Sequence, residues 1–544
     1  MKLYEYLADA FIAEGVSEVF ALMGDANMMW LSAMERHESV NVVHARHEGA
    51  ALTMADGYSR STGAVGVCSV TSGPGITQLG TALTAAARHS SQVVVFAGDT
   101  PRSMPQHVQR YDPGPLVQAC GARFLRADTV EEALDLTAVS FHLAASGGPV
   151  VMAIPYDVQE TDEPWGMAPS TSSRFALGTN RTRPDQDRIA ALAAELCDHK
   201  VVVLAGAGCV GGSCRASLLE LSRLLGAPVA TTLRAKGLFD GEPHNLGVAG
   251  AFSTLPAREA FAQAEVVLAF GASLGYHTTE GGYLFPAARV IQIDQRPRGL
   301  VDGQRTADVH IIADASAAAD ELIELLGSGV ARPWFDAVIA PESADDQVAP
   351  ATVPPRQAMR IIDGALPKRA QIVVGAGHFW NFVVPGLSGR RPENMQFHYD
   401  FGAISHSLPA AIGAARARPD SLTVAIEGDG SLLMNLQELE TLARHRLPVL
   451  IIIMNDGAYG AEYHKLRAKG AAPDASVFGF TDFAAVSRGF GITASTVTKA
   501  DELASAIAEF AQNPQPTVID IRLDVQAASD TYKRLYYGQE TVLG

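Results

Sequence analysis

Short apolar runs alternate along the chain with longer stretches in which Ala and Leu recur at helical spacing. Several runs are apolar at every position, which is typical of parallel strands whose two faces are both covered by helices. This alternation predicts an α/β fold built from parallel sheets. The clearest expected strands are residues 64–70, 92–97, 150–154, 200–204, 266–270, 290–293, 372–374, 422–426, 448–454 and 517–521.

Two stretches interrupt this pattern, residues 160–184 and 331–355, which are polar, contain proline and have no periodicity. They divide the chain into three α/β blocks, residues 1–160, 185–330 and 356–544. We therefore expect three doubly wound parallel-sheet domains, which a chain of 544 residues is long enough to form. Residues 527–544 are expected to form a tail or a lid on the third domain.

Composition narrows the class of protein. The 59 acidic residues outnumber the 42 Lys and Arg, giving a formal charge of −17, so we expect no nucleic-acid or anionic-membrane partner. No apolar run has the length of a membrane-spanning helix, and the first residues lack the core of a signal peptide. Five cysteines are too few for a disulfide framework and are expected to be buried thiols. A cytoplasmic enzyme is expected.

The most informative segment is Gly428-Asp429-Gly430-Ser431, which follows an expected strand. Asn455 comes 26 residues after Asp429, beyond an expected helix over 433–444 and a second strand. One strand–helix–strand unit separates the two side chains, so both are predicted at the carboxyl ends of neighbouring parallel strands. Carboxylate, amide and carbonyl oxygens suit Mg²⁺, and the two glycines let backbone N–H groups approach a phosphate. An ordinary glycine-rich turn is the alternative.

Together with other motifs, this segment resembles the diphosphate–metal motif of thiamine-diphosphate enzymes. The further motifs are residues 47–51 (His-Glu-Gly-Ala-Ala), 54–58 (Met-Ala-Asp-Gly-Tyr), 71–75 (Thr-Ser-Gly-Pro-Gly) and 408–414 (Leu-Pro-Ala-Ala-Ile-Gly-Ala). The resemblance is closest to the group of acetolactate synthase, benzaldehyde lyase and 2-oxo acid decarboxylase. It implies a pyrimidine-binding domain, a central Rossmann-like domain and a diphosphate-binding domain, in that order, with thiamine diphosphate and Mg²⁺ as cofactors.

The resemblance also implies roles for single residues. Glu48 is expected to hydrogen-bond the aminopyrimidine ring, and Ile404 to support the bent form of the coenzyme. Asp429, Asn455 and Gly457 are the expected metal ligands. The remaining expected cofactor contacts are Ser72, Pro74, Gly377, His378, Gly402, Gly428, Gly430, Ser431, Ala458 and Tyr459. In this family the acid and the metal site come from different subunits, which implies a homodimer or a homotetramer.

The expected reaction is decarboxylation of a 2-oxo acid, followed by protonation of the resulting enamine or its ligation to a carbonyl acceptor. Beside Glu48, proton transfer is expected from Gln109, His378 or His406, with His378 the preferred histidine, although each histidine could equally be structural. The expected substrate mouth is lined by Ala26, Asn27, Met28, Gln109, Phe379 and Trp380. The alternatives are a flavin-linked 2-oxo acid oxidase or acyltransferase of the same fold, and a catalytically idle binding protein.

The middle block holds a second glycine motif, Gly206-x-Gly208-x-x-Gly211, after an expected strand. A nicotinamide dinucleotide site would need an acid at the end of the next strand, around 228–233, and none is there. Relatives hold FAD or ADP in this domain or leave it empty. The segment from Gly271 to Leu274 lacks the arginine-containing sequence of flavin-bearing acetolactate synthases, so FAD is not expected.

Overall fold

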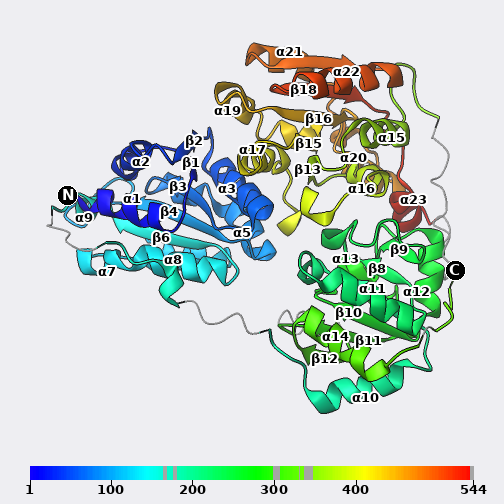
Figure 1. Ribbon diagram of the computed structural model, residues 1–544. Coiled ribbons are helices and arrows are strands. Elements are labelled where there is room, and N and C mark those ends of the chain that lie inside the picture. The colour runs from blue at the N-terminus through cyan, green and yellow to red at the C-terminus, as the bar shows by residue number, and fades with distance from the viewer. Residues whose placement is uncertain (163–167, 176–180, 298–306, 330, 336–346, 539–544) are drawn as a thin grey trace.

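The computed structural model describes residues 1–162, 168–175, 181–297, 307–329, 331–335 and 347–538 (Figure 1). Three six-stranded sheets follow one another along the chain, and the paired strands run parallel throughout these residues. Helices flank each sheet, so the expected α/β class with three parallel sheets is confirmed. Parts of both expected linkers, 163–167, 176–180 and 336–346, and the end of the expected tail, 539–544, lie outside the described residues.

The N-terminal sheet has the strand order β2-β1-β3-β4-β6-β5. Its strands are β1 (Glu18–Ala21), β2 (Asn41–His44), β3 (Gly66–Val70), β4 (Val93–Asp99), β5 (Arg123–Arg126) and β6 (Val150–Pro155). Its helices are α1 (Leu3–Ala13), α2 (Met28–Glu35), α3 (Glu48–Thr62), α4 (Pro74–Thr77), α5 (Gly80–His89), α6 (Gly114–Ala119), α7 (Val130–Leu134), α8 (Leu136–Ala145) and α9 (Tyr156–Gln159).

The central sheet has the order β12-β11-β10-β7-β8-β9, which is the Rossmann arrangement. Its strands are β7 (Val201–Ala205), β8 (Val229–Thr231), β9 (Asn245–Val248), β10 (Val266–Phe270), β11 (Arg289–Asp294) and β12 (Val309–Ile312). Its helices are α10 (Gln186–Leu196), α11 (Cys214–Leu225), α12 (Leu255–Gln263), α13 (Tyr276–Thr279) and α14 (Ala315–Leu326), and short 3₁₀ turns include η2 (Ala207–Cys209) and η3 (Leu233–Ala235).

The C-terminal sheet has the order β14-β13-β15-β16-β18-β17. Its strands are β13 (Gln371–Gly375), β14 (Met395–His398), β15 (Thr423–Gly428), β16 (Val449–Asn455), β17 (Thr493–Val497) and β18 (Thr517–Arg522). Its helices are α15 (Pro355–Ala365), α16 (Trp380–Gly386), α17 (Ser407–Ala417), α18 (Asp429–Leu432), α19 (Glu438–Arg444), α20 (Gly460–Ala468), α21 (Phe483–Gly489), α22 (Ala500–Gln512) and α23 (Asp530–Tyr537).

The N-terminal and C-terminal sheets share one hydrophobic core, which joins them through helices α3 and α17 (Figure 1). These helices cross at two glycines. A Cβ atom on Gly57 would lie 2.2 Å from the carbonyl oxygen of Ala410, and one on Gly413 would lie 1.9 Å from that of Met54. Any larger side chain at either position would push the helices apart, so this crossing fixes how the two sheets sit against each other.

Two details differ from the sequence-based expectations. The helix expected over 433–444 is wrong as one element: α18 and α19 flank an irregular turn, in which the Asn435 amide donates to the carbonyl oxygen of Ser405 (2.6 Å). Cys197 is exposed, while the other four cysteines are buried as expected. No helix of the described ranges combines the length and the apolar character that crossing a bilayer requires.

Candidate active site

Asp429, Asn455 and Gly457 come together at the carboxyl ends of β15 and β16. The register pairs Gly428 with Met454, so the residues that follow these strands are neighbours. The Gly457 N–H donates to Asp429 Oδ2 (2.8 Å) and points toward Asn455 Oδ1 (3.2 Å). Two hard oxygen atoms therefore converge on one point of the backbone, and a φ of +69° at Gly457 shapes the turn there.

The carboxyl of Asp429 is 3 % exposed. Burial raises its pKa to about 7, and the nearby charge of Asp520 adds to the shift. Burial and the charge of Asp429 also raise the pKa of Asp456 well above its usual range. Two acids held together away from water are stabilised by a bound cation. The donor set has one carboxylate, one amide and one carbonyl, and no cluster of three His, Cys, Asp or Glu side chains suited to a metal occurs in the described part of the chain.

Further residues, which sequence reasoning missed, hold Asn455 and the Asp429 loop in place. The Asn455 amide nitrogen donates to Asp520 (2.8 Å), and Asp520 pairs with Arg522 (3.0 Å). This bond leaves the Asn455 oxygen directed toward Gly457. Glu427, fully buried at the end of β15, accepts from the Ser431 hydroxyl and from the Leu408 N–H. A buried acid within a largely apolar strand was the available signal for both Glu427 and Asp520.

Ile404 lies on a strained segment tied to the same loop. Phe401, Gly402 and Ser405 have φ values of 64°, 70° and 78°. The Ser405 N–H donates to Ser431 Oγ (2.6 Å), and the Ser405 carbonyl accepts from Asn435 (2.6 Å). The residues after β15 thus hold both the Asp429 carboxylate and the half-buried Ile404.

Aromatic rings cover the glycines of this loop. A Cβ atom on Gly428 would lie 3.1 Å from the Phe379 ring, and one on Gly430 would lie 2.7 Å from the ring of Tyr459. Tyr459 is 46 % exposed and contacts Phe478 edge to face, with ring centroids 5.2 Å apart. Ala458 is buried, and a β-bridge pairs it with Val477. Tyr459 therefore forms the exposed rim of the loop.

His378 occupies a closed setting instead of the open mouth expected from sequence. Its Nε2 accepts the Ser529 N–H (3.2 Å), and its ring lies 4.4 Å from that of His464 and 4.6 Å from that of Tyr532 on α23. Burial, with His464 adding, lowers the pKa of His378 well below its usual range. The imidazole is therefore neutral near pH 7 and holds the start of α23. Gly377, just before it, packs against the Phe379 ring.

At the N-terminal sheet the structure brings Gln109 to Ser72. The Ser72 hydroxyl donates to Gln109 Oε1 (2.6 Å), and Gly73, at φ +59°, leaves room for the Gln109 side chain. Pro74 starts α4 beside them and is exposed. Glu48 starts α3 and is half-buried, with His47 capping the helix through Gly49 N–H. Glu48, Ser72 and Gln109 lie in the segments that follow β2, β3 and β4, at the carboxyl ends of these parallel strands.

The predicted substrate residues are divided between several settings. Ala26 is buried, and Asn27 is fully buried with its amide bonded to Ser69 and to the 22–24 backbone, so both shape the loop. Met28, 42 % exposed, is the open side chain of this loop. Trp380 points elsewhere: its ring meets Phe252 (5.3 Å) and Tyr399 (5.4 Å) edge-on or tilted. It lines a pocket between the three sheets rather than the Asp429 loop.

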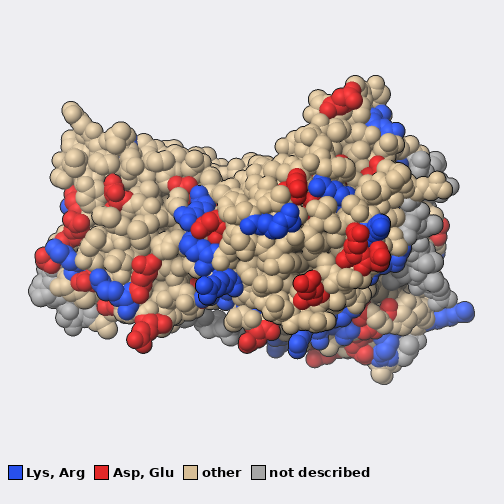
Figure 2. All heavy atoms as spheres, turned by 90° about the horizontal axis from the view of Figure 1, so that it is seen from above, with Lys and Arg blue, Asp and Glu red and all other residues tan. Residues whose placement is uncertain are grey.

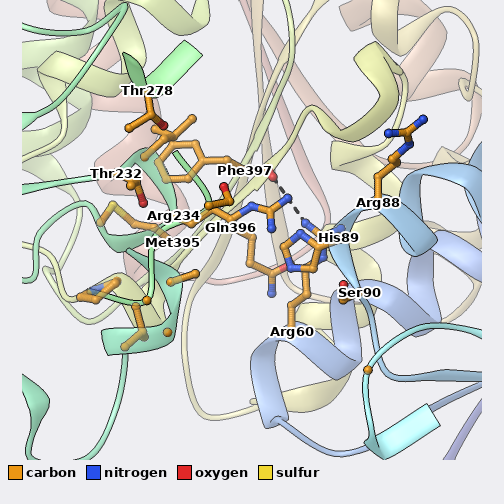
Figure 3. A pocket seen from close by; sticks show the side chains of 18 of the residues that line it. Arg60, Arg88, His89, Ser90, Thr232, Arg234, Thr278, Met395, Gln396 and Phe397 are labelled. Atoms are coloured by element: carbon orange, nitrogen blue, oxygen red, sulfur yellow. Dashed lines mark hydrogen bonds between the residues drawn. The ribbon is translucent and has the colours of Figure 1, made fainter. Parts of the chain in front are cut away.

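That pocket has a volume of about 1110 Å³. The strand ends of the central sheet form one side, including the η2 turn, Thr232, Gly271 and Asp294. Basic side chains gather on the other side, where Figure 3 shows Arg60, His89 and Arg234 pointing toward one another. Its size and its position at the carboxyl ends of Rossmann-ordered strands suit a nucleotide.

Comparison with known proteins agrees with this geometry. Three family models match, all of thiamine pyrophosphate enzymes: the N-terminal TPP binding domain over residues 1–115, the central domain over 190–322 and the C-terminal TPP binding domain over 375–521. Acetolactate synthase 2, chloroplastic, of Zea mays is 31% identical, covering 95% of this chain and 84% of its own length. The acetolactate synthase large subunit of Parasynechococcus marenigrum is 30% identical, with 95% and 86% covered.

These matches show a thiamine-diphosphate-dependent enzyme of the decarboxylase and carboligase type. They do not favour the flavin-linked oxidase, the acyltransferase or the idle binding protein. The chain belongs to the acetolactate synthase family of thiamine pyrophosphate enzymes.

Proposed function

We propose that this enzyme uses thiamine diphosphate and Mg²⁺ to decarboxylate a 2-oxo acid and to ligate the remaining acyl unit to a carbonyl acceptor. The observation that carries the proposal is the convergence of Asp429, Asn455 and Gly457 on one loop that also fixes Ile404. When bound, the coenzyme supplies a carbon nucleophile and an electron sink. The chain's own residues bind it, bend it and control its protons.

The loop fits a diphosphate-bound magnesium ion. Mg²⁺ takes a few oxygen ligands from protein and the rest from phosphate and water, as one carboxylate, one amide and one backbone carbonyl would allow. Burial opposes ionisation of the Asp429 carboxyl. A cation bound beside it would compensate the charge of the carboxylate. Ser431, Gly428 and Gly430 border the same place, and α18 begins there. We assign these residues, with Gly402, Ala458 and Tyr459, to the diphosphate end of the site.

Ile404 is assigned to support the bent form of the coenzyme. Glu48 is assigned to the ring nitrogen of the aminopyrimidine, with which its carboxyl would share a proton. Because both roles depend on exact placement, the bonds that hold Ser405 and the helix start at Glu48 are part of the catalytic design.

Each active site is proposed to lie between two subunits. Within one chain, the backbone just before Glu48 is bound to α19: the Arg46 N–H donates to Glu438 (3.1 Å), and the Arg46 side chain pairs with Glu440. Large apolar side chains are exposed in both of the domains that would form the site. They are Met23, Met28, Met104 and Val108 in the N-terminal domain and Leu433, Met434, Tyr459, Phe478 and Phe480 in the C-terminal domain. A second copy would cover them.

The surface is compatible with such a partner. Seen from above, the upper outline of the molecule dips between two raised ends, and few charged side chains are visible along this dip (Figure 2). Self-complementary apolar faces with closed symmetry are the usual basis of homodimers, and a dimer of dimers is a homotetramer. Five free cysteines fit a reducing compartment, so we place the enzyme in the cytoplasm.

Gln109 and Met28 are proposed to meet the substrate, since both side chains reach the open edge of the N-terminal sheet. The Gln109 amide nitrogen stays available for a substrate oxygen while its Oε1 accepts from Ser72. Ala26 and Asn27 give this loop its shape, and Phe379 gives the facing loop its floor. His378 orders α23, and Trp380 borders the central pocket.

We propose that the enzyme works without FAD. The central pocket has room for a nucleotide, but the segment after β10 lacks the arginine-containing sequence of flavin-bearing relatives. Absorbance of the purified protein in the flavin region, before and after denaturation, tests this: released flavin in stoichiometric amount would refute it.

Subunit complementation tests the shared site. Glu48→Gln and Asp429→Asn should each be inactive, because one loses the ring-nitrogen acid and the other the metal ligand. In mixed dimers one of the two sites recovers both native residues, so random reassociation should restore about a quarter of wild-type activity. If each site lay within one chain, no activity would return.

The donor and acceptor are found by a product screen. Pyruvate, benzoylformate and aliphatic 2-oxo acids are supplied with and without aldehyde acceptors, and products are identified by mass spectrometry. Ligated products that depend on thiamine diphosphate and Mg²⁺ support the proposal. Turnover by the Glu48→Gln variant at the wild-type rate would overturn its assigned mechanism.

A further inference from the structure

Asp400 comes directly before the strained segment that contains Ile404. Side chains from three other parts of the chain contact its carboxylate. Its carboxylate lies 3.3 Å from Arg60 at the end of α3 and 3.1 Å from His89 at the end of α5. Arg234, from the η3 turn of the central sheet, pairs with its other oxygen. We call these four residues the Asp400 cluster; Figure 3 shows its three basic members converging.

The cluster is buried around Asp400 and Arg60, and together with Asp56 it is balanced in charge. The side chains of Asp400 and Arg60 are 5% and 8% exposed, and Arg60 also pairs with Asp56 (2.7 Å), which is buried as well. Burial, Arg60 and Arg234 lower the pKa of His89 to about 4, so its ring is neutral at pH 7 and acts by hydrogen bonding. With Asp56, two carboxylates thus face two guanidinium groups. Removing one of these four charged groups would leave the charges of the others unbalanced.

The segment after Asp400 needs such an anchor. Phe401 and Ser405 hold left-handed φ values of 64° and 78°, which are strained for non-glycine residues. Such strain persists only where the surroundings fix both ends. Ser431 and Asn435 fix the end at Ser405. The Asp400 cluster fixes the other end, four residues before Ile404.

We propose that Asp400 and Arg234 are positioning residues for the reaction, because their ion pair holds Ile404 against the coenzyme. The inference rests on the proposed function, in which Ile404 supports the bent coenzyme. It adds that the central sheet takes part in catalysis through Arg234, although the expected contacts to the coenzyme all lie in the other two sheets.

The variants are Asp400→Asn, Arg234→Met and Arg234→Lys, with Asp363→Asn as matched control. Asp363 is likewise buried and paired with a buried guanidinium, that of Arg390 (3.0 Å), but the structure ties it to Lys368 and Ser388 instead of the 401–405 segment. Ile404→Ala tests the underlying assignment. Arg234 is 29% exposed at its side chain, so its variants should fold even if Asp400→Asn does not.

Two readouts are used. The first is amide hydrogen exchange of residues 397–405 in the coenzyme-free protein. It should speed up about tenfold in Asp400→Asn and Arg234→Met, less in Arg234→Lys, and stay unchanged in Asp363→Asn. The second is deuterium exchange at the reactive thiazolium carbon, measured by NMR per bound coenzyme. It should slow about 10- to 100-fold in the same order, with a much smaller loss of coenzyme affinity.

The outcomes separate the two claims. If Ile404→Ala slows thiazolium exchange but Asp400→Asn and Arg234→Met do not, the positioning role is refuted while the proposed function stands. If Ile404→Ala leaves that exchange unchanged, the support assignment fails and this inference fails with it. If Asp363→Asn reproduces the Asp400→Asn pattern in both readouts, the effect is general destabilisation and the inference is overturned.

Discussion

The Asp429 carboxyl provides a test of the proposed metal site that needs neither substrate nor turnover. In the metal-free protein burial raises its pKa from 3.8 to about 7. That is a difference of about 3 units, which corresponds to about 4 kcal/mol at 1.36 kcal/mol per unit. Between these two pKa values the unfolded chain is ionised and the folded chain is not. The metal-free fold therefore loses stability as pH rises from about 4 to about 7.

Asp429→Asn removes this titration. The amide can no longer accept from both Gly430 and Gly457, which costs about 1–3 kcal/mol. This cost is the same at every pH, whereas the ionisation cost grows by about 3 kcal/mol between pH 5 and pH 8. Relative to wild type, the metal-free variant should therefore gain about 3 kcal/mol over that interval, or about 5–10 °C in the unfolding midpoint of a unit of this size.

The assay is thermal unfolding of chelator-stripped protein at about pH 5 and about pH 8. Glu509→Gln, an exposed acid on α22, is the control and should follow the wild type. Mg²⁺ with thiamine diphosphate should then raise the midpoint of the wild type at the higher pH but not that of Asp429→Asn. Identical pH dependence of wild type and variant would refute the reasoning that Asp429 is a buried, cation-seeking carboxyl.

Two further substitutions test the crossing of α3 and α17 and the proposed substrate contact of Gln109. Gly413→Ala should cost about 1–3 kcal/mol in chemical denaturation, because its Cβ would meet the Met54 carbonyl, whereas Gly364→Ala on α15 has open space and should be neutral or slightly stabilising. Equal effects would contradict the crossing argument. Gln109→Ala should change the ratio of ligated to protonated product severalfold with little change in coenzyme affinity, as product analysis and titration would show; an unaltered ratio would place Gln109 outside the reaction centre.

The sequence predicted the inner strands well and the edges poorly. Every strand expected from an apolar run is confirmed, because such runs belong to strands covered on both faces. The strands it missed are β1 and the six sheet edges β2, β5, β9, β12, β14 and β17. An edge strand has one neighbour and tolerates exposed polar residues, as in the Arg123–Arg126 strand, so it has no continuous apolar run.

For the candidate site too, the sequence predicted some features and missed others. The Asp429–Asn455 pairing was predictable, because one strand–helix–strand unit fixes where both side chains emerge. The roles of Asp520, Asn435 and Asp400 were not, because their partners are far away in sequence and only the folded chain brings them together. The closed setting of His378 was missed for the same reason, since α23 packs over it from the other end of the domain.

The strand orders of the N-terminal and C-terminal sheets are identical when each is numbered from its own first strand. Helices α3 and α17 are then counterparts, each leading from the second strand to the third, and each contributes one glycine to their crossing. A single polypeptide thus contains two domains of the same topology that pack through equivalent helices. The two domains differ in what this common plan presents: one has an acid, Glu48, where its helix starts, and the other has the Asp429 loop, our proposed cation site, after its third strand. Neither domain could replace the other, although the same architecture underlies both.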